Sequence, residues 1–284
     1  MISVLLASLT NFRHILTLLR MRNVRSDRPL LAEQRRRKIL ELLEQEGQIT
    51  VRDLSERFSI SAVTLRSDLN ALSATGAVVR SHGGAVRQGE PVQDYPLRFK
   101  ASLHRAEKAQ IGLAAANMIQ PGEVIILDSG TTTAEIAHQI KNRGIHSITI
   151  ITDAINVVSE LVDAPGVSVI CIGGILRPVS QSFVGPQAET MLKDLYADRL
   201  FLAVDGFDLE IGLTTPDVLE AQLNSLMMTA AKDVTVVADH SKLGRRSVSR
   251  IGSIEQIHRL ITDTKAPEDF IKALRARGIE VIQA

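Results

Sequence analysis

The chain has 284 residues, of which 45% are hydrophobic and 23% charged, as in a globular protein with room for one small domain and one of ordinary size. A single cysteine excludes a disulfide within one chain, which is typical of the reducing cytosol. The net charge of +1 hides an asymmetry, since residues 1–90 carry 14 Lys and Arg against 9 Asp and Glu, whereas the remainder carries 19 against 23. The first part is therefore the one suited to a polyanionic partner.

Residues 1–31 are expected to be an N-terminal extension. They carry several arginines and no acid before Asp27. The apolar run 2–9 is too short to span a membrane, and no Lys or Arg precedes it, as a secretory signal would require. An organelle transit peptide also fits this composition, but we favour an over-extended start, with Met21 or a nearby codon as the true beginning.

A first helix is predicted over residues 32–46, where Ile39, Leu42 and Leu43 point inward and Gly47 ends the pattern. The basic run 35–38 has two interpretations. It is either an ordinary solvated face or a set of phosphate contacts that includes Arg36. Beside the helices that follow, we favour phosphate contact.

Residues 49–72 predict two short helices joined by a tight turn. Thr50 is a good N-cap for the first, in which Val51, Leu54 and Phe58 form one apolar stripe. Ser61 can cap the second helix, in which three leucines repeat at i, i+4 and i+7. That stripe turns a short, polar set of side chains outward, namely Val63, Thr64, Arg66, Ser67 and Asn70.

Two helices, a turn and such an outward face indicate a helix-turn-helix with a recognition helix, although the spacing alone fits an ordinary helical hairpin equally well. After the helix breaker Gly76, two apolar runs separated by Gly83 and Gly84 predict a hairpin, the wing of a winged helix. The pattern Ser61-x-x-Thr64-Leu65-Arg66-x-Asp68-Leu69, followed by Arg-Ser-His-Gly-Gly-Ala at 80–85, resembles the DNA-binding module of DeoR-type bacterial transcriptional regulators. The resemblance implies binding of double-stranded operator DNA by residues 32–87. The residues expected to contact it are Arg36, Ser61, Val63, Thr64, Arg66, Ser67 and Asn70, with Arg80 and His82 from the wing.

Residues 88–97 lose all apolar periodicity, hold two prolines and are predicted to be a linker. From residue 98 to the end, apolar strands alternate with helices, which indicates an α/β domain with a parallel sheet covered on both faces. Strands are expected at 123–127, 147–152, 167–172, 199–204, 234–239, 259–263 and 280–282, and helices at 105–119 and 134–140. The lone Cys171 lies in one of the apolar runs, and we expect it to be buried and inert.

In such sheets, ligands bind at the carboxyl ends of the strands. A turn rich in glycine and hydroxyls follows the first strand and opens a helix, where N–H groups could hold a phosphate: Asp128, Ser129, Gly130, Thr131, Thr132 and Thr133. Such a turn is also common without a ligand. Further polar residues follow other strands: Gly173, Gly174, Arg177, Ser182, Asp205, Asp208 and Lys242. Together they favour an anionic, hydroxyl-rich ligand such as a sugar phosphate.

The segments DSGTTTAEIA, IGG-x-LR, QSFVG, DGFD, EAQLN and ADHSKLG resemble, in order, the effector domain of the same DeoR-type regulators. That family's domain is related to the ribose-phosphate isomerase and CoA-transferase fold. The resemblance implies that Ser129, Gly130, Thr131 and Thr132 bind the phosphate, with Asp205, Asp208, Glu220 and Lys242 around the sugar. The segments QSFVGPQAE and GFDLEIGLTTPDVLEAQLN look most like the repressors of N-acetylgalactosamine and galactosamine utilisation, so an amino-sugar phosphate is the expected effector.

A sugar-phosphate isomerase with an accessory DNA-binding domain is the alternative. That enzyme's glycine-rich loop begins with a catalytic lysine, whereas residues 210–215 here have a single glycine and no lysine. Proton transfer at a sugar carbonyl needs a base and a partner that stabilises the developing charge. We therefore expect binding without turnover, no cofactor and no metal, since the histidines show no metal-type spacing.

The sequence thus predicts a cytoplasmic regulator with no membrane segment. We expect it to be a repressor that a phosphorylated sugar releases from its operator. Because operators are symmetric and one module carries little excess charge, a homo-oligomer is expected.

Overall fold

The computed structural model describes residues 32–46, 48–74, 78–81, 83–87 and 94–284. The chain divides into two compact units, Met1–Gln88 and Gly89–Ala284. Among the described residues, no helix has both the length and the apolar character needed to cross a membrane.

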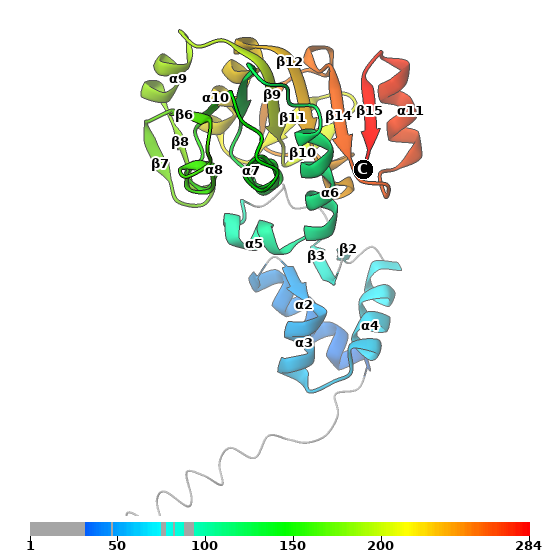
Figure 1. Cartoon of the computed structure of the whole chain (residues 1–284). Helices are drawn as coiled ribbons and strands as arrows, with labels where there is room; N and C mark the ends of the chain where they lie inside the picture. The colour runs from blue at the N-terminus through cyan, green and yellow to red at the C-terminus, as the bar shows by residue number, and fades with distance from the viewer. Residues whose placement is uncertain (1–31, 47, 75–77, 82, 88–93) are drawn as a thin grey trace, which may run out of the picture. The chain divides into compact units, whose positions relative to one another are not determined.

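The first unit has the three helices that the sequence predicts: α2 (Ala32–Glu46), α3 (Val51–Phe58) and α4 (Ala62–Ala74) (Figure 1). Thr50 caps α3, since its hydroxyl accepts a hydrogen bond from the Asp53 backbone N–H at 3.1 Å. Ser61 caps α4 in the same way, through the Thr64 N–H at 3.3 Å. Both caps satisfy donors that have no partner within their helix, which fixes where each helix begins.

The core of this unit forms where the helices face one another, and it holds Ile39, Leu43, Leu54, Leu65 and Leu69, each at most 1% exposed. These are residues of the predicted apolar stripes, so the 3.6-residue periodicity identified the buried faces correctly.

The wing is a three-stranded antiparallel sheet in the order β1-β3-β2, formed by β1 (Gln48–Thr50), β2 (Val78–Ser81) and β3 (Gly84–Arg87). The β2–β3 hairpin is the predicted one, whereas β1 was not predicted because three residues with one apolar side chain carry no period. Gly84 must be a glycine, because a Cβ there would lie 2.0 Å from the Ile49 carbonyl oxygen on β1.

A buried ion pair ties α2 to α4. The Asp68 carboxylate is 2% exposed and accepts from the Arg35 guanidinium and, at 3.0 Å, from Arg36 Nε. Charges this deep persist only when they are paired, so both arginines stabilise the fold of the winged-helix unit.

The second unit is built on seven parallel strands, in the order β15-β14-β12-β9-β4-β5-β6. Its α/β architecture with a parallel sheet confirms the predicted fold class. The strands are β4 (Val124–Leu127), β5 (Ile148–Thr152), β6 (Val167–Cys171), β9 (Ala197–Ala203), β12 (Ala231–Val237), β14 (Arg259–Thr262) and β15 (Glu280–Gln283).

Helices cover both faces of this sheet (Figure 1). On one face, α6 (Arg105–Ala116), α7 (Thr131–Asn142) and α8 (Ile155–Leu161) bury residues such as Ile111, Ile136 and Val157. On the other, α9 (Pro186–Leu192), α10 (Val218–Ala230) and α11 (Glu268–Ala276) bury residues such as Met227 and Phe270. A short helix, α5 (Leu97–Ser102), precedes α6.

Two antiparallel additions were not predicted. One is the hairpin of β7 (Ile175–Arg177) and β8 (Ser182–Val184); the other is a sheet of β10 (Gly206–Asp208), β11 (Gly212–Thr215) and β13 (Ser249–Gly252). Their strands have three or four residues each, too few for an alternating pattern to be recognised. Both additions follow the carboxyl ends of sheet strands and so contribute to the candidate site.

The prediction of a buried thiol at Cys171 is wrong, because this residue ends β6 and is exposed. β6 is an edge strand of the sheet, with a neighbouring strand on one side only. Partial burial and, second, the Asp153 carboxyl raise the pKa of the Cys171 thiol, which keeps it in the less reactive protonated form.

Candidate functional site

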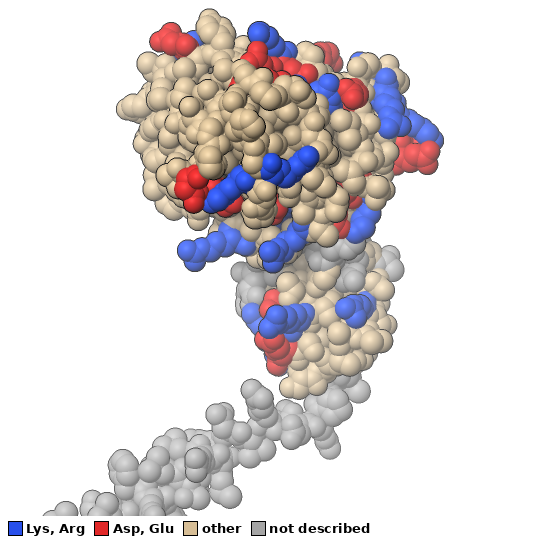
Figure 2. All heavy atoms as spheres, viewed as in Figure 1, with Lys and Arg blue, Asp and Glu red and all other residues tan. Residues whose placement is uncertain are grey.

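The outward face of α4 is open to solvent in the winged-helix unit. Val63 is 74% exposed although it is apolar. The other residues predicted for this face are also exposed: Ser61, Thr64, Arg66, Ser67 and Asn70. These side chains therefore cover a continuous helix surface whose packing leaves them available to a partner. On the face of the molecule seen in Figure 2, basic side chains of this unit lie beside acidic ones.

The other residues predicted to contact DNA are not seen as exposed side chains. Arg36 is half-buried and paired with Asp68, so its position is set by the fold. Arg80 lies on β2, but its side chain is outside the described residues, and so is the whole of His82.

In the second unit, the chain order reverses beside β4. The chain runs from β4 outward to β5 and β6, then returns to place β9 on the other side of β4 and continues outward to β12, β14 and β15. Ligands of such sheets bind where the order reverses, beyond the carboxyl ends of the strands. Asp128 directly follows β4 and Asp205 follows β9, so both lie at this point.

The turn predicted to bind a phosphate lies at this point and opens α7. Ser129 and Thr131 are partly accessible, whereas Thr133 is fully buried and its hydroxyl donates to the Gly130 carbonyl at 3.2 Å. Thr133 therefore stabilises the turn. The accessible hydroxyls and the first N–H groups of α7 are the donors that a ligand could bind. Gly130 is required by packing, since a Cβ there would lie 2.8 Å from the Ala203 Cβ.

Two buried carboxyl groups flank this loop. Asp128 is 1% exposed and accepts from the Ala203 N–H at 3.0 Å, which makes it a link between β4 and β9 rather than an accessible ligand-binding group. Burial, reinforced by Asp153 and Glu220, raises the pKa of Asp128 well above its usual range. Burial, with Glu220 second, raises the pKa of Asp153 to about 8. Near neutral pH these groups are thus predominantly protonated, and the loop is less repulsive to an anion than its sequence suggests.

Two polar oxygens beside the loop have no hydrogen-bond partner among the described residues. They are Oδ1 of Asp153 and Oδ1 of Asn156, both inaccessible to solvent. Asn156 also donates to the Gly130 carbonyl at 3.4 Å. Buried polar atoms without partners are rare and mark places where a further group is expected.

Arg177, at the end of β7, is surrounded by carboxylates. It contacts Asp94 and lies 3.1 Å from Asp217 and 3.3 Å from Glu220. Its guanidinium also donates to the Ser180 hydroxyl at 3.1 Å. The arginine is only 15% exposed, so these pairs form in a partly desolvated setting.

Glu220, in the first turn of α10, is held by several groups besides Arg177. Its carboxylate accepts from Ser182 at 3.3 Å and from Thr215 at 3.2 Å. It is 7% exposed, and the neighbouring Asp217 caps α10. Ser182 and Glu220, both predicted to bind the effector, are therefore in direct contact.

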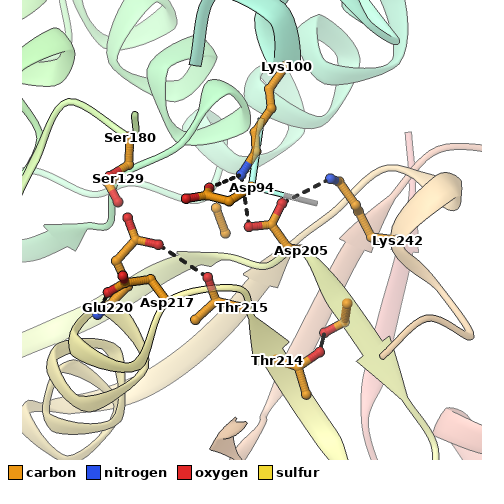
Figure 3. Close-up of polar contacts among 12 residues, drawn as sticks. Asp94, Lys100, Ser129, Ser180, Asp205, Thr214, Thr215, Asp217, Glu220 and Lys242 are labelled. Atoms are coloured by element: carbon orange, nitrogen blue, oxygen red, sulfur yellow. Dashed lines mark hydrogen bonds and ion pairs between the residues drawn. The ribbon is translucent and has the colours of Figure 1, made fainter. Parts of the chain in front are cut away.

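A second charged row continues from Asp94 (Figure 3). Lys100 Nζ lies 4.0 Å from Asp94 and 2.9 Å from Asp205, and Asp205 also accepts from Lys242 at 3.3 Å. Burial alone would raise the pKa of Asp205, but Lys242 and Lys100 outweigh it and lower that pKa. The Asp205 carboxylate is therefore charged and shared between two lysines.

Two predicted residues, Asp208 and Gly174, have local structural roles. Asp208 accepts from the Glu210 and Ile211 N–H groups in the β10–β11 turn and pairs with Arg246 at 2.8 Å. Gly174 lies where a Cβ would meet the Val184 carbonyl at 2.7 Å, so it is needed for the β7–β8 hairpin. Gly173 has open space around its Cα, and nothing described in the structure requires a glycine there.

Sequence reasoning missed Asp94, Lys100, Asp153 and Asp217. Asp94 falls within the predicted linker, yet it contacts the α/β domain. Asp94 and Lys100 reach Arg177 and Asp205 only in the folded chain, so no local pattern connects them. Asp217 did carry a signal, since an aspartate immediately before a helix is a typical N-cap.

One group of side chains could hold a metal ion. His104, Asp239 and His240 each place one donor atom within 4.8 Å of the other two. His104 precedes α6, and the other two follow β12, so no local spacing connects them.

Known proteins match along most of this chain. Residues 35–90 match the family described as DeoR-like helix-turn-helix domain, and residues 103–264 match the DeoR C terminal sensor domain. The putative aga operon transcriptional repressor of Escherichia coli O157:H7 is 40% identical over 88% of this chain and 93% of its own length. The glycerol-3-phosphate regulon repressor of Escherichia coli K12 is 29% identical over 87% and 97%. Among solved structures, ribose 5-phosphate isomerase A from Methanocaldococcus jannaschii covers 48% of this chain and 53% of its own, at 16% identity and a TM-score of 0.35.

Proposed function

Because the chain belongs to the DeoR family of transcriptional regulators, we propose that it represses a sugar or amino-sugar catabolic operon and leaves the operator when a phosphorylated sugar binds. The observation that carries this proposal is the polar site at the point where the strand order of the α/β domain reverses. The relatives are named as regulators rather than enzymes. The β10–β11 turn, at the position where the isomerase has its catalytic lysine, has none.

Operator DNA is read by the exposed face of α4. Arg66 can donate two parallel hydrogen bonds to a guanine edge, and Val63 can contact a thymine methyl group. An apolar side chain that is 74% exposed gains from such burial, which gives Val63 a reason to lie outside the core. Ser61 and Thr64 share a hydrogen bond at 2.9 Å and place their hydroxyls at the start of this helix, where a phosphate would bind.

The effector is proposed to bind with its phosphate at the first turn of α7. Ser129, Thr131 and the N–H groups there supply donors, and the raised pKa of Asp153 supplies a neutral carboxyl in place of a repelling charge. Arg177 and Lys100 supply the balancing positive charge.

The sugar is proposed to lie among Asp205, Glu220 and Lys242. Carboxylates in that position would favour a protonated amine on the sugar over a hydroxyl, since a charge-assisted hydrogen bond is the stronger one. An amino-sugar phosphate is therefore the leading effector, in agreement with the aga operon named for one relative.

Effector binding must change the DNA-binding unit, and Asp94 offers a physical route. Asp94 falls within the predicted linker and pairs with Arg177 and Lys100, whereas Asp205, which shares Lys100, belongs to the body of the domain. A phosphate that takes over these cations displaces Asp94 and frees the segment that leads to the winged-helix unit. Because the coupling between two binding sites is reciprocal, effector binding then weakens the free energy of DNA binding, typically by about 1–3 kcal/mol.

A homo-oligomer is proposed because operator half-sites are read by paired modules. The α/β domain exposes the apolar residues Ile175 and Leu176 on β7, and Met191 and Tyr196 on or just after α9. A second copy of the chain that covered these residues would bury their apolar surface. Light scattering on the purified protein would measure the number of chains.

The function is tested with operator DNA carrying a fluorescent label and a panel of sugar phosphates that includes galactosamine 6-phosphate. We expect one member to release the DNA, and Thr131→Val or Lys242→Ala to keep DNA binding but lose the response. A wild-type protein that binds operator but ignores every sugar phosphate would contradict the effector proposal. Turnover of the sugar phosphate in a coupled assay would favour an enzyme instead.

A further inference from the structure

We propose that His104, Asp239 and His240 bind a divalent transition-metal ion at the sheet edge beyond β12 and β14. Asp239 and His240 follow β12, and Asp263 follows the neighbouring strand β14. His104 reaches this edge from the residue before α6. The proposed ion lies next to the proposed sugar position, because Lys242, which pairs with Asp205, is two residues after His240.

The three side chains are already gathered. One donor atom from each lies within 4.8 Å of the others, and the two imidazole rings meet edge to face with centroids 5.0 Å apart. A tetrahedral zinc ion with bonds of about 2 Å needs donors roughly 3.3 Å apart. Small rotations of partly exposed histidine side chains would close that difference.

His240 is oriented as metal-binding histidines usually are. Its Nδ1 lies 2.9 and 3.0 Å from the two carboxylate oxygens of Asp263, which is 3% exposed and also accepts from the His240 N–H at 2.7 Å. A carboxylate beside one ring nitrogen is the usual orienting partner of a metal-binding histidine. Asp263 is thus a positioning residue for the proposed site.

The Asp239 carboxylate is also held in place by hydrogen bonds. It is 1% exposed, and its Oδ1 accepts from the Ser241 N–H at 3.0 Å and from the Ser241 hydroxyl at 2.5 Å. Its Oδ2 accepts no hydrogen bond from the described residues.

The nearby ammonium groups are held by other partners. Lys108 Nζ donates to the backbone carbonyls of Lys100 and Leu103, at 2.5 and 2.8 Å, and Lys242 Nζ pairs with Asp205. Asp239 and Asp263 supply the negative charge.

The donor set indicates the kind of ion. Two imidazoles and one carboxylate suit Zn²⁺, Co²⁺ or Ni²⁺, whereas Mg²⁺ and Ca²⁺ prefer oxygen donors throughout. Three protein ligands leave a position for water or another group. Through His104, the bound ion would fix the start of α6 to the sheet. The residues just before His104 already hold Lys108 through their backbone carbonyls.

The test uses the full-length chain without a histidine tag. We expect one Co²⁺ or Zn²⁺ per chain by equilibrium dialysis, with the visible absorption bands of four-coordinate Co²⁺. His104→Ala and His240→Ala should each weaken binding at least tenfold, and Asp263→Asn about tenfold, as loss of an orienting partner does. His138→Ala is the matched control, since His138 is exposed on α7 and pairs with Glu160, and it should bind as the wild type does.

Thermal unfolding without metal establishes that each variant folds, and added Zn²⁺ should raise the Tm of the wild type and of His138→Ala but not of His240→Ala. The proposal is overturned if the wild type takes up no metal. It is equally overturned if His138→Ala loses as much affinity as the two ligand variants, or if those variants lose none.

Discussion

The Asp94→Asn variant tests how the effector site communicates with the DNA-binding unit. In the free protein, the Asp94 carboxylate contacts the Arg177 guanidinium and lies 4.0 Å from Lys100 Nζ. The side chains of Asp94, Arg177 and Lys100 are 25%, 15% and 19% exposed. Asparagine keeps the size of the side chain and removes its charge.

The size of the effect follows from these contacts. A hydrogen bond between charged groups contributes about 1.5–3 kcal/mol when it is shielded from water. Because a quarter of the Asp94 side chain is exposed, we take a value just below this range, about 1.4 kcal/mol, which corresponds to about tenfold in an equilibrium constant. An effector that must displace Asp94 should therefore bind Asp94→Asn about tenfold more tightly.

The assay is release of labelled operator DNA as the sugar phosphate is titrated, with direct effector binding measured by calorimetry. Asp163→Asn is the matched control, because Asp163 also pairs with a lysine, Lys141, at 2.7 Å, but is 69% exposed. The control should respond as the wild type does. Unchanged or weaker effector binding by Asp94→Asn would refute displacement, even if the wild type responds normally to the effector.

Three further variants test other parts of the structure. Arg66→Ala should abolish operator binding in a gel-shift assay and keep effector binding, whereas Arg52→Ala, an exposed arginine on α3, should change DNA binding little; equal losses would contradict the recognition surface. Asp68→Asn breaks a buried ion pair and should destabilise the winged-helix unit by about 3 kcal/mol in urea unfolding of the full chain, and a loss below about 1 kcal/mol would contradict this. The pKa of Asp153 is raised by burial to about 8, so the folded state keeps a proton that the unfolded state loses near pH 4. Its contribution to stability is therefore lost as the pH rises through about 8, and Asp153→Asn should unfold with a flatter pH dependence between pH 5 and 9 than the wild type, as urea midpoints would measure.

The sequence was most informative where a periodic pattern repeated. Three helices of the winged-helix unit and seven strands of the sheet were predictable, because a buried face needs apolar side chains at a fixed spacing. The caps at Thr50 and Ser61 were predictable for a similar reason, since the hydrogen bond joins residues three apart. Short antiparallel strands such as β1 and β7 have no such repeat, and their position depends on the partner strand.

Some features of the candidate site could likewise be predicted from the sequence, and others could not. Residues just beyond a strand, such as Asp205 after β9, lie at the sheet edge as predicted, because the parallel strands of one sheet all end on the same side. The roles of Asp128 and Thr133 were not predictable, since a buried side chain that supports a turn and an accessible one that meets a ligand look alike in sequence. Asp94 and Lys100 were missed because only the return of the chain onto the domain brings them to Arg177 and Asp205.

The arrangement of charges suits a sensor better than a catalyst. The Glu220 carboxylate accepts from Arg177, Ser182 and Thr215, so it links α10 to the β7–β8 hairpin and to β11. A sensor instead needs two arrangements of similar free energy that a ligand binds unequally. In the proposed exchange, Arg177 and Lys100 replace one anionic partner, Asp94, with a phosphate, so both cations stay paired and the released carboxylate becomes hydrated. The proposed exchange would change little in the body of the domain and would release the segment around Asp94, which falls within the predicted linker.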